Sequence, residues 1–191
     1  MLISVMKKNN LNNHLIIAMP HLDDTIFNKS VILINNHSND GAMGLIINKP
    51  IDSKNTSKIL FNEFNNISRK IKNNIYFGGP VNLESCFILH DNSYLLDHSL
   101  KLSSNLSLTS DIKAIDDIAR GRGPKNYKFN MGYSGWSSGQ LEKEIKNGDW
   151  LILKNPDNFI FDVPDEKKWI YIINKLGIDF HEDWTSKGGE A

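Results

Sequence analysis

The residues best suited to covalent chemistry are two serines that follow a strand-like segment in the second half of the chain. Residues 135–139, GWSSG, match the G-x-S-x-G pattern of a nucleophile elbow, with Ser137 as the nucleophile. A serine on such a turn projects its hydroxyl away from the sheet, and the following helix N-terminus can stabilise an oxyanion. His181 and later aspartates would complete a Ser–Asp–His order. The competing interpretation is that Ser137 only caps the helix, and the missing parallel strand–helix–strand context favours it.

Three short motifs place imidazole and carboxylate groups close together, as a metal site would require. Asp and Asn in such loops more often hydrogen-bond their own backbone and form turns. Because no rigid element is predicted beneath these motifs, we predict neither a bound metal nor another cofactor. The motifs are His21-x-Asp23-Asp24, His90-Asp91 and Asp97-His98.

Three further segments have a chemical and a purely structural interpretation. Gly78-Gly79-Pro80 follows a strand-like run and could hold an anion on its backbone N–H groups, but close packing against another strand explains the glycines more simply. The basic loop at 120–125 could contact phosphate, or it could be a solvated helix end. Cys86 begins an apolar run, which indicates a packed residue rather than a reactive thiol.

Composition disfavours several classes of protein. The 191 residues include 22 Lys plus Arg and 22 Asp plus Glu, so the net charge is zero, whereas a nucleic-acid-binding protein usually has a basic excess. The single cysteine fits a reducing compartment. No apolar run approaches the roughly 18 residues of a membrane helix, and the N-terminus lacks the order of a signal peptide. We therefore expect a cytoplasmic protein without a membrane partner, with nucleic acid disfavoured.

The periodicity of apolar residues predicts a single domain over residues 14–179. A flexible N-terminal extension at 1–13 and a polar tail at 180–191 flank it. Two apolar runs separated by Asp40-Gly41 predict a hairpin whose strands are covered on both faces. The first half is predicted to contain strands at 14–18, 30–36, 43–48 and 75–77, a helix within 60–71, a second hairpin pairing 86–89 with 94–96, and an edge strand around 106–108.

The stretch Tyr127–Trp150 carries the clearest secondary-structure pattern of the chain. Alternation over 127–133 predicts a half-buried strand, and Gly132 and Gly135 predict a sharp turn. Ser137 as N-cap, with Gln140 three residues later, predicts a capping box at the start of a helix. Elsewhere the second half is predicted to contain a helix capped by Ser110 or Asp111 that buries Ile112, Ile115 and Ala119, strands at 150–153 and 159–163, and a last helix from about Pro164 to Gly177.

Hairpins with interspersed helices indicate an α+β fold with a mostly antiparallel or mixed sheet. Several motifs, taken in order, resemble the AlgH/YqgE family of bacterial proteins. That resemblance implies a bent sheet forming a pseudo-barrel with helices packed outside, a cytoplasmic location, and a family name linked to transcriptional regulation without agreed catalytic residues. The matching motifs are HLIIAMP (14–20), LDD (22–24), SVI (30–32), GAMGLIINKP (41–50), FGGPV (77–81), FILH (87–90), GYSGW (132–136), GQLE (139–142) and LGID (176–179).

These observations favour a non-enzymatic regulatory domain that binds a small molecule or a protein, as a monomer or small homo-oligomer. The alternatives are a serine or metal-dependent hydrolase and a DNA-binding transcriptional regulator. The ligand-binding surface is predicted where glycine-marked turns and aromatic residues would meet. The predicted site residues are Asn48, Lys49, Gly78, Gly79, Tyr133, Trp136 and Gln140.

Overall fold

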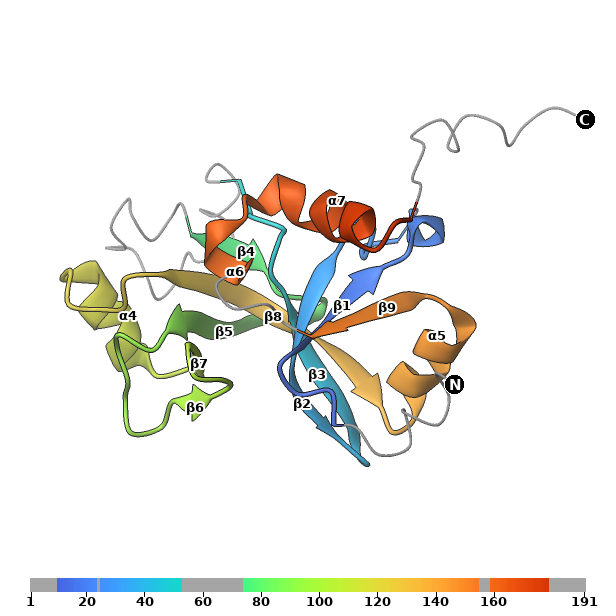
Figure 1. Ribbon diagram of the computed structural model, residues 1–191. Coiled ribbons are helices and arrows are strands. Elements are labelled where there is room, and N and C mark those ends of the chain that lie inside the picture. Colours follow the sequence, from blue (N-terminus) through green and yellow to red (C-terminus); the bar gives the residue numbers. More distant parts are fainter. Residues whose placement is uncertain (1–9, 24, 53–73, 155–158, 179–191) are drawn as a thin grey trace, which may run out of the picture.

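The computed structural model describes residues 10–23, 25–52, 74–154 and 159–178. Within them the chain forms an α+β fold built on one strongly curled sheet, with helices packed around it (Figure 1). The sheet is mostly antiparallel and forms a half-barrel, which confirms the predicted fold class. The predicted helix within 60–71 lies outside the described residues. The strand predicted at 75–77 is present as β4 (Ile75–Phe77).

The sheet has nine strands, and its two outermost strands in the main order are β6 and β9. The order across the sheet is β6-β7-β5-β8-β3-β2-β1-β9, and β4 pairs parallel with β8 outside this order. The strands other than β4 are β1 (His14–Ala18), β2 (Val31–Ser38), β3 (Gly41–Ile46), β5 (Val81–Asp91), β6 (Leu100–Lys101), β7 (Leu106–Thr109), β8 (Tyr127–Ser137) and β9 (Trp150–Lys154).

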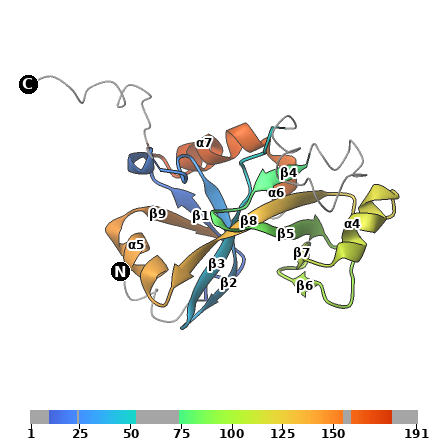
Figure 2. The ribbon, with the colours of Figure 1, turned by 180° about the vertical axis from the view of Figure 1, so that it is seen from behind.

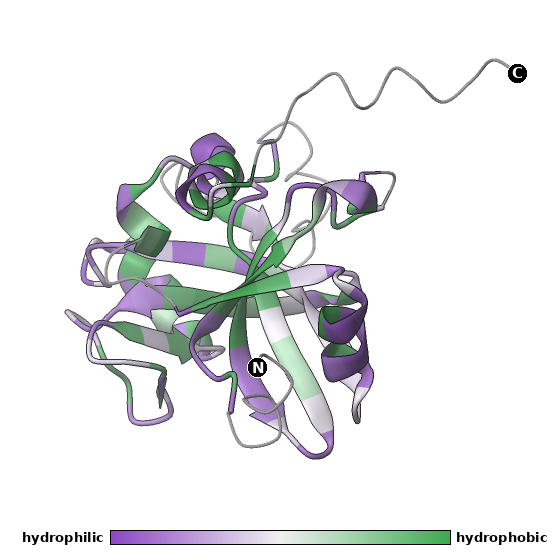
Figure 3. Cartoon of the chain, turned by 45° about the vertical axis from the view of Figure 1, so that its right-hand side comes forward, coloured by the Kyte–Doolittle hydropathy of each residue, from purple (hydrophilic) through white to green (hydrophobic). Residues whose placement is uncertain are grey.

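The central strands are buried on both faces, as their continuous apolar runs predict. Leu15 and Ile17 of β1 contribute to one hydrophobic cluster, whereas Ile16 and Ala18 contribute to another on the opposite face. This division follows from the period of two along a strand. The centre of the sheet is mostly hydrophobic, and the helices and loops carry many of the hydrophilic residues (Figure 3).

Strand β8 joins the two parts of the sheet and bends at Gly132. Its first half pairs with β5 and β4, and its second half pairs with β3. Gly132 has φ +67°, and a Cβ there would lie 2.5 Å from the carbonyl oxygen of Gly79. Only glycine fits both the positive φ and this close approach of two backbones. The sharp turn predicted here is therefore a bend within one continuous strand.

Two helices cover one face of the curled sheet. The helices α6 (Phe159–Asp162) and α7 (Asp165–Lys175) bury Phe159, Trp169 and Ile172 in a cluster with side chains from both parts of the sheet. The indole Nε1 of Trp169 donates to the carbonyl of Ala18 at 2.7 Å, which fixes α7 against β1. Figures 1 and 2 show α7 lying along the sheet from the two opposite views.

The remaining helical segments pack elsewhere. Helix α5 (Gln140–Asn147) covers the opposite face of β1–β3, and α4 (Ile112–Ala119) packs near the β5–β8 end of the sheet. A short 3-10 turn, η1 (Pro20–Leu22), follows β1. In the part of the chain that the structure describes, no helix is long and apolar enough to span a membrane.

Several local predictions are wrong for identifiable reasons. Residues 94–96 form no strand, because β5 pairs with β7 instead, so β7 is not an edge strand. Residues 159–163 form α6 rather than a strand, since their short apolar run carries no reliable period. Helix α4 buries Ala114 and Ile118, whereas Ile112 is 67% exposed, so its apolar face is rotated from the predicted one. Asp111 is the N-cap, as predicted, and accepts from Lys113 N–H.

Helix α5 begins later than predicted. Strand β8 continues to Ser137, and the N-cap is Gly139, which has a left-handed φ of +72°. One half of the predicted capping box is nevertheless present, because Gln140 Oε1 accepts from Ser137 N–H at 3.0 Å. Trp136 and Leu141, which flank the start of this helix, belong to the same hydrophobic cluster.

Candidate functional site

A pocket of about 250 Å³ opens between the sheet and the α6–α7 segment. Its lining comes from three parts of the chain that are distant in sequence. These are Asn74 and Tyr76 at β4, residues 125–128 at the start of β8, and Phe161, Val163, Pro164, Asp165 and Lys168 at the junction of α6 and α7. A concave site lined by several polar groups is the usual form of a small-molecule site.

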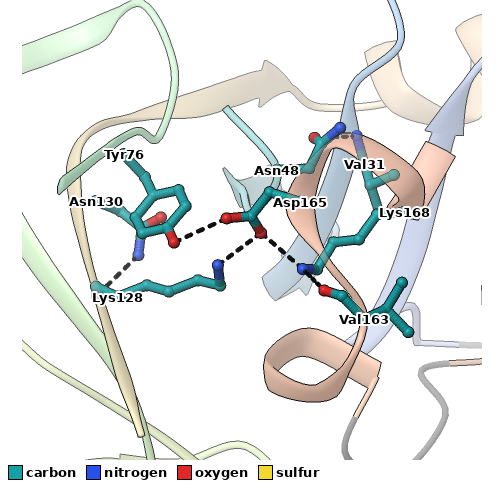
Figure 4. Close-up of polar contacts among 8 residues, drawn as sticks. All are labelled: Val31, Asn48, Tyr76, Lys128, Asn130, Val163, Asp165 and Lys168. Carbon is teal, nitrogen blue, oxygen red and sulfur yellow. Dashed lines mark hydrogen bonds and ion pairs between the residues drawn. The ribbon is translucent and has the colours of Figure 1, made fainter. Parts of the chain in front are cut away.

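Asp165 is the centre of the polar network at this pocket (Figure 4). Its Oδ1 accepts from Lys128 Nζ at 2.8 Å and from Lys168 Nζ at 2.6 Å, and its Oδ2 accepts from the Tyr76 hydroxyl at 2.9 Å. Lys168 Nζ also donates to the carbonyl of Val163. One carboxylate therefore holds two ammonium groups and a phenol in place.

The elements fix these side chains with little freedom. Parallel pairing of β4 with β8 sets Tyr76 beside Asn130, so the Tyr76 ring lies next to Lys128, whose Nζ is 3.8 Å from the ring centroid. Asp165 and Lys168 lie one turn apart at the start of α7. Lys168 is 1% exposed and the Lys128 side chain 6% exposed, which is unusual because lysine is almost never fully buried without a partner.

Burial and mutual attraction perturb the pKa values of Lys128, Tyr76 and Asp165. Burial lowers the pKa of Lys128 to about 8, although Asp165 opposes the change. Burial and the neighbouring Asp165 carboxylate raise the pKa of Tyr76, so the phenol stays protonated. Burial alone would raise the pKa of Asp165, but the two lysines outweigh it and hold that pKa below its ordinary value. Perturbed groups that converge on a pocket are a physical signature of a functional site.

The structure places the seven predicted site residues in two groups, and none of them lines this pocket. Asn48 bonds the N–H of Val31 and the carbonyl of Lys29, and Lys49 Nζ donates to the carbonyl of Ile26. Figure 4 shows the Asn48–Val31 contact. The carbonyl of Lys49 accepts from Phe77 N–H at 2.9 Å, which brings this segment to the Gly78-Gly79 turn.

Gly78, Gly79 and Tyr133 complete the first group. A Cβ on Gly79 would lie 2.2 Å from the carbonyl carbon of Tyr133, and one on Gly78 would lie 2.3 Å from the Gly132 carbonyl oxygen. Both glycines are thus required by the close crossing of this turn over β8. The half-buried Tyr133 packs its ring edge-on to Phe87 at 6.1 Å. Whether this group binds a ligand stays a prediction.

Trp136 and Gln140 form the second group, on the side of the sheet covered by α5. Trp136 Nε1 and Trp150 Nε1 both donate to Glu144 Oε2, at 2.7 and 2.8 Å, and Gln140 Nε2 donates to Glu144 Oε1 at 2.9 Å. These side chains converge on Glu144 and anchor α5 to the sheet.

Sequence reasoning missed the Lys128–Asp165–Lys168 site because it assigned charged residues in alternating strands to solvent. Strand β8 is instead buried on both faces from Tyr127 to Gly132. One signal was available for Lys168, which lies four residues before Ile172 on the apolar stripe of the last helix. A charge on such a stripe requires a buried partner.

The other candidate motifs have these positions. Ser137 ends β8 where that strand runs antiparallel to β3, and His181 lies outside the described residues. His21 Nε2 bonds Asp149 Oδ1 at 3.0 Å, and no group of three or more metal-ligating side chains occurs among residues 10–23, 25–52, 74–154 and 159–178. Burial raises the pKa of Cys86 to about 12, which makes the thiol a poor nucleophile.

The curled sheet with this helix arrangement defines a known class of α+β protein. A solved structure of the AlgH protein from Pseudomonas aeruginosa superposes with a TM-score of 0.74 and 31% identity, covering 96% of this chain and 97% of that one. A crystal structure of a protein from Corynebacterium diphtheriae gives a TM-score of 0.69 at 22% identity, covering 94% and 97%.

Sequence comparison agrees with the structural match. A family model described as AlgH-like matches residues 15–181, so the chain belongs to the AlgH-like family. A UPF0301 protein of Saccharophagus degradans is 36% identical over 171 residues, covering 90% of this chain and 84% of the relative. A UPF0301 protein of Cupriavidus pinatubonensis is 37% identical over 185 residues, covering 95% and 94%. The resemblance inferred from the motifs is confirmed.

Proposed function

We propose that this protein is a non-enzymatic ligand-binding domain whose small-molecule ligand occupies the pocket between β4, β8 and the α6–α7 segment. One observation carries the proposal: Tyr76, Lys128 and Lys168 are all at least nine-tenths buried, yet all three line the same open pocket. Buried charged groups are ordinarily paired with one another, and here the paired groups also border a concave space, as the polar groups of a small-molecule site do. The pocket also joins the sheet to α7, so occupancy would stabilise the contact between them.

The pocket supports a binding role better than a catalytic one. The two ammonium groups and the phenol already share one carboxylate, and among the described residues no serine, histidine or cysteine lines the pocket. A regulatory role and a cytoplasmic location are part of the same proposal. The cytoplasmic location is supported by the single cysteine, which fits a reducing compartment, and neither part rests on a contact of the pocket.

The test is a direct search for a co-purified molecule. Protein purified without dialysis is measured by native mass spectrometry, beside a Val163→Trp variant in which the indole fills the pocket. We expect an additional mass on the natural chain that is absent from the variant, with both proteins equally folded by circular dichroism. An additional mass retained by the variant would place the ligand elsewhere and refute the assignment of this pocket. Lys125→Trp, at an exposed lining position, provides a second block should Val163→Trp unfold the protein.

Direct DNA binding is the candidate suggested by the family name, and no pocket or helix arrangement described above favours it. The discriminating experiment is a gel shift with random duplex at low and moderate salt. A salt-sensitive shift would replace the ligand-binding proposal, because phosphate contacts dominate the affinity of such complexes.

A further inference from the structure

We propose that the ligand of this pocket is a small anion, with a carboxylate or phosphate group held by Lys128, Lys168 and Lys125. The inference rests on the proposed function and names the chemical class that it leaves open. The pocket is lined by three lysines and one carboxylate, Asp165, so the charged side chains of the lining sum to +2. The whole chain has a net charge of zero, so the residues outside the lining have no such positive excess.

The hydrogen-bonding capacity of the two buried ammonium groups is not filled by Asp165. An ammonium group has three N–H donors. Among the described residues, Lys128 uses one toward Asp165 and directs a second charge contact to the Tyr76 ring, while Lys168 uses one toward Asp165 and one toward the Val163 carbonyl. Each lysine therefore retains at least one donor for an acceptor in the pocket. A second oxyanion would supply it.

Local electrostatics select an anion over a neutral or cationic ligand. Asp165 Oδ1 already accepts from both lysines, with the Nζ of Lys128 at 2.8 Å and the Nζ of Lys168 at 2.6 Å. Two cations on one carboxylate leave an uncompensated positive charge in a poorly solvated site, and such a charge is costly. An anion beside Lys128 would neutralise it and raise the pKa of the amine back toward its ordinary value.

The size of the pocket limits the ligand. The pocket volume of about 250 Å³ is below the roughly 300–1,000 Å³ of typical small-molecule pockets, which favours a small ligand. That volume fits inorganic phosphate or a short carboxylic acid. A nucleotide would not be enclosed. Lys125 is exposed at the rim, where it can meet the charged end of an entering ligand.

The experiment titrates the isotope-labelled natural chain by NMR at constant ionic strength with inorganic phosphate, acetate and succinate. Acetamide and succinamide serve as neutral analogues, and chloride is the background ion. We expect saturable shifts at the amides of residues 125–128 and 163–165 with the anions only. Lys128→Met is expected to weaken binding by about tenfold to a hundredfold, the value of one lost charge-assisted hydrogen bond. Lys125→Met, at an exposed position, should fold normally and weaken it severalfold.

Lys167→Met is the matched control, because it removes one positive charge from an exposed position adjacent to Lys168. It should leave the affinity within about twofold, as a remote screened charge would. Equal binding of the amides and the acids, or unchanged binding by Lys128→Met, would overturn the anion inference while leaving a pocket ligand in place. Absence of saturable binding by any of the three anions would overturn it as well. The co-purification experiment with Val163→Trp fails or succeeds independently of these titrations.

Discussion

Replacing Asp165 by asparagine should destabilise the protein strongly at neutral pH. The change keeps the size of the side chain but removes the only negative charge within hydrogen-bonding distance of Lys128 and Lys168 among the described residues. It also replaces one acceptor oxygen by an amide. Breaking a buried ion pair by removing one partner costs about 3–5 kcal/mol, because the remaining charge is left buried.

The burial of these three side chains predicts that Asp165→Asn lowers the free energy of unfolding by roughly the full 3–5 kcal/mol. The Asp165 side chain is 18% exposed and the two lysines are 1% and 6% exposed, so solvent screening is weak. Loss of the favourable charge at the N-terminus of α7 adds about 0.5 kcal/mol. Glu166→Gln is the matched control, since Glu166 is the other acidic residue of the same helical turn and is exposed. The control should cost less than about 1 kcal/mol.

The assay is urea and thermal unfolding, both followed by circular dichroism, at pH 7 and pH 9.5. For a domain of this size, about 3–5 kcal/mol corresponds to a fall in Tm of about 6–20 °C. The cost should shrink at pH 9.5, because Lys128 can then lose its proton and no longer needs a counter-charge. The double variant with Lys128→Met should regain part of the lost stability, because only Lys168 is then left buried without a counter-charge. A loss below about 1 kcal/mol, or the same loss at both pH values, would refute the electrostatic account.

Three further predictions concern other contacts. Lys128→Met should leave stability unchanged or raise it by about 1–3 kcal/mol at pH 7. The pKa of Lys128 in the folded protein is about 8, below the ordinary value of 10.5, so the stability of the natural chain should rise by about 3 kcal/mol between these two pH values. This rise should vanish in the variant. Gly132→Ala should cost about 2–4 kcal/mol in chemical unfolding because its Cβ meets the Gly79 carbonyl, whereas Gly121→Ala, at a similar φ with open space, should cost only about 1 kcal/mol. Glu144→Gln should lower stability by about 1–3 kcal/mol and change tryptophan fluorescence, since two indole N–H groups lose a charged acceptor; an unchanged emission spectrum would contradict that.

Most of the strands and the family could be predicted from the sequence alone. The run at 14–18 forms β1 with the predicted bounds, and the apolar stripe through Trp169, Ile172 and Ile173 forms α7. These elements can be predicted because burial imposes an apolar period of two residues on a strand and of 3.6 residues on a helix. Each period is visible in a short stretch of sequence. Gly177, predicted to end the last helix, has the left-handed φ of +67° that such a position favours.

The bend of β8 and the position of the charged pocket depend on contacts between segments that are distant in sequence. Gly132 was read as a turn, because a positive φ predicts a reversal, whereas pairing with β5 and then β3 keeps the chain extended. Lys128 and Asp165 are 37 residues apart, and their contact requires the packing of α7 on the sheet. Local periodicity contains no information about such a pairing. The contact forms because the packing of α7 on the sheet, through Trp169 and Ile172, brings Asp165 to Lys128.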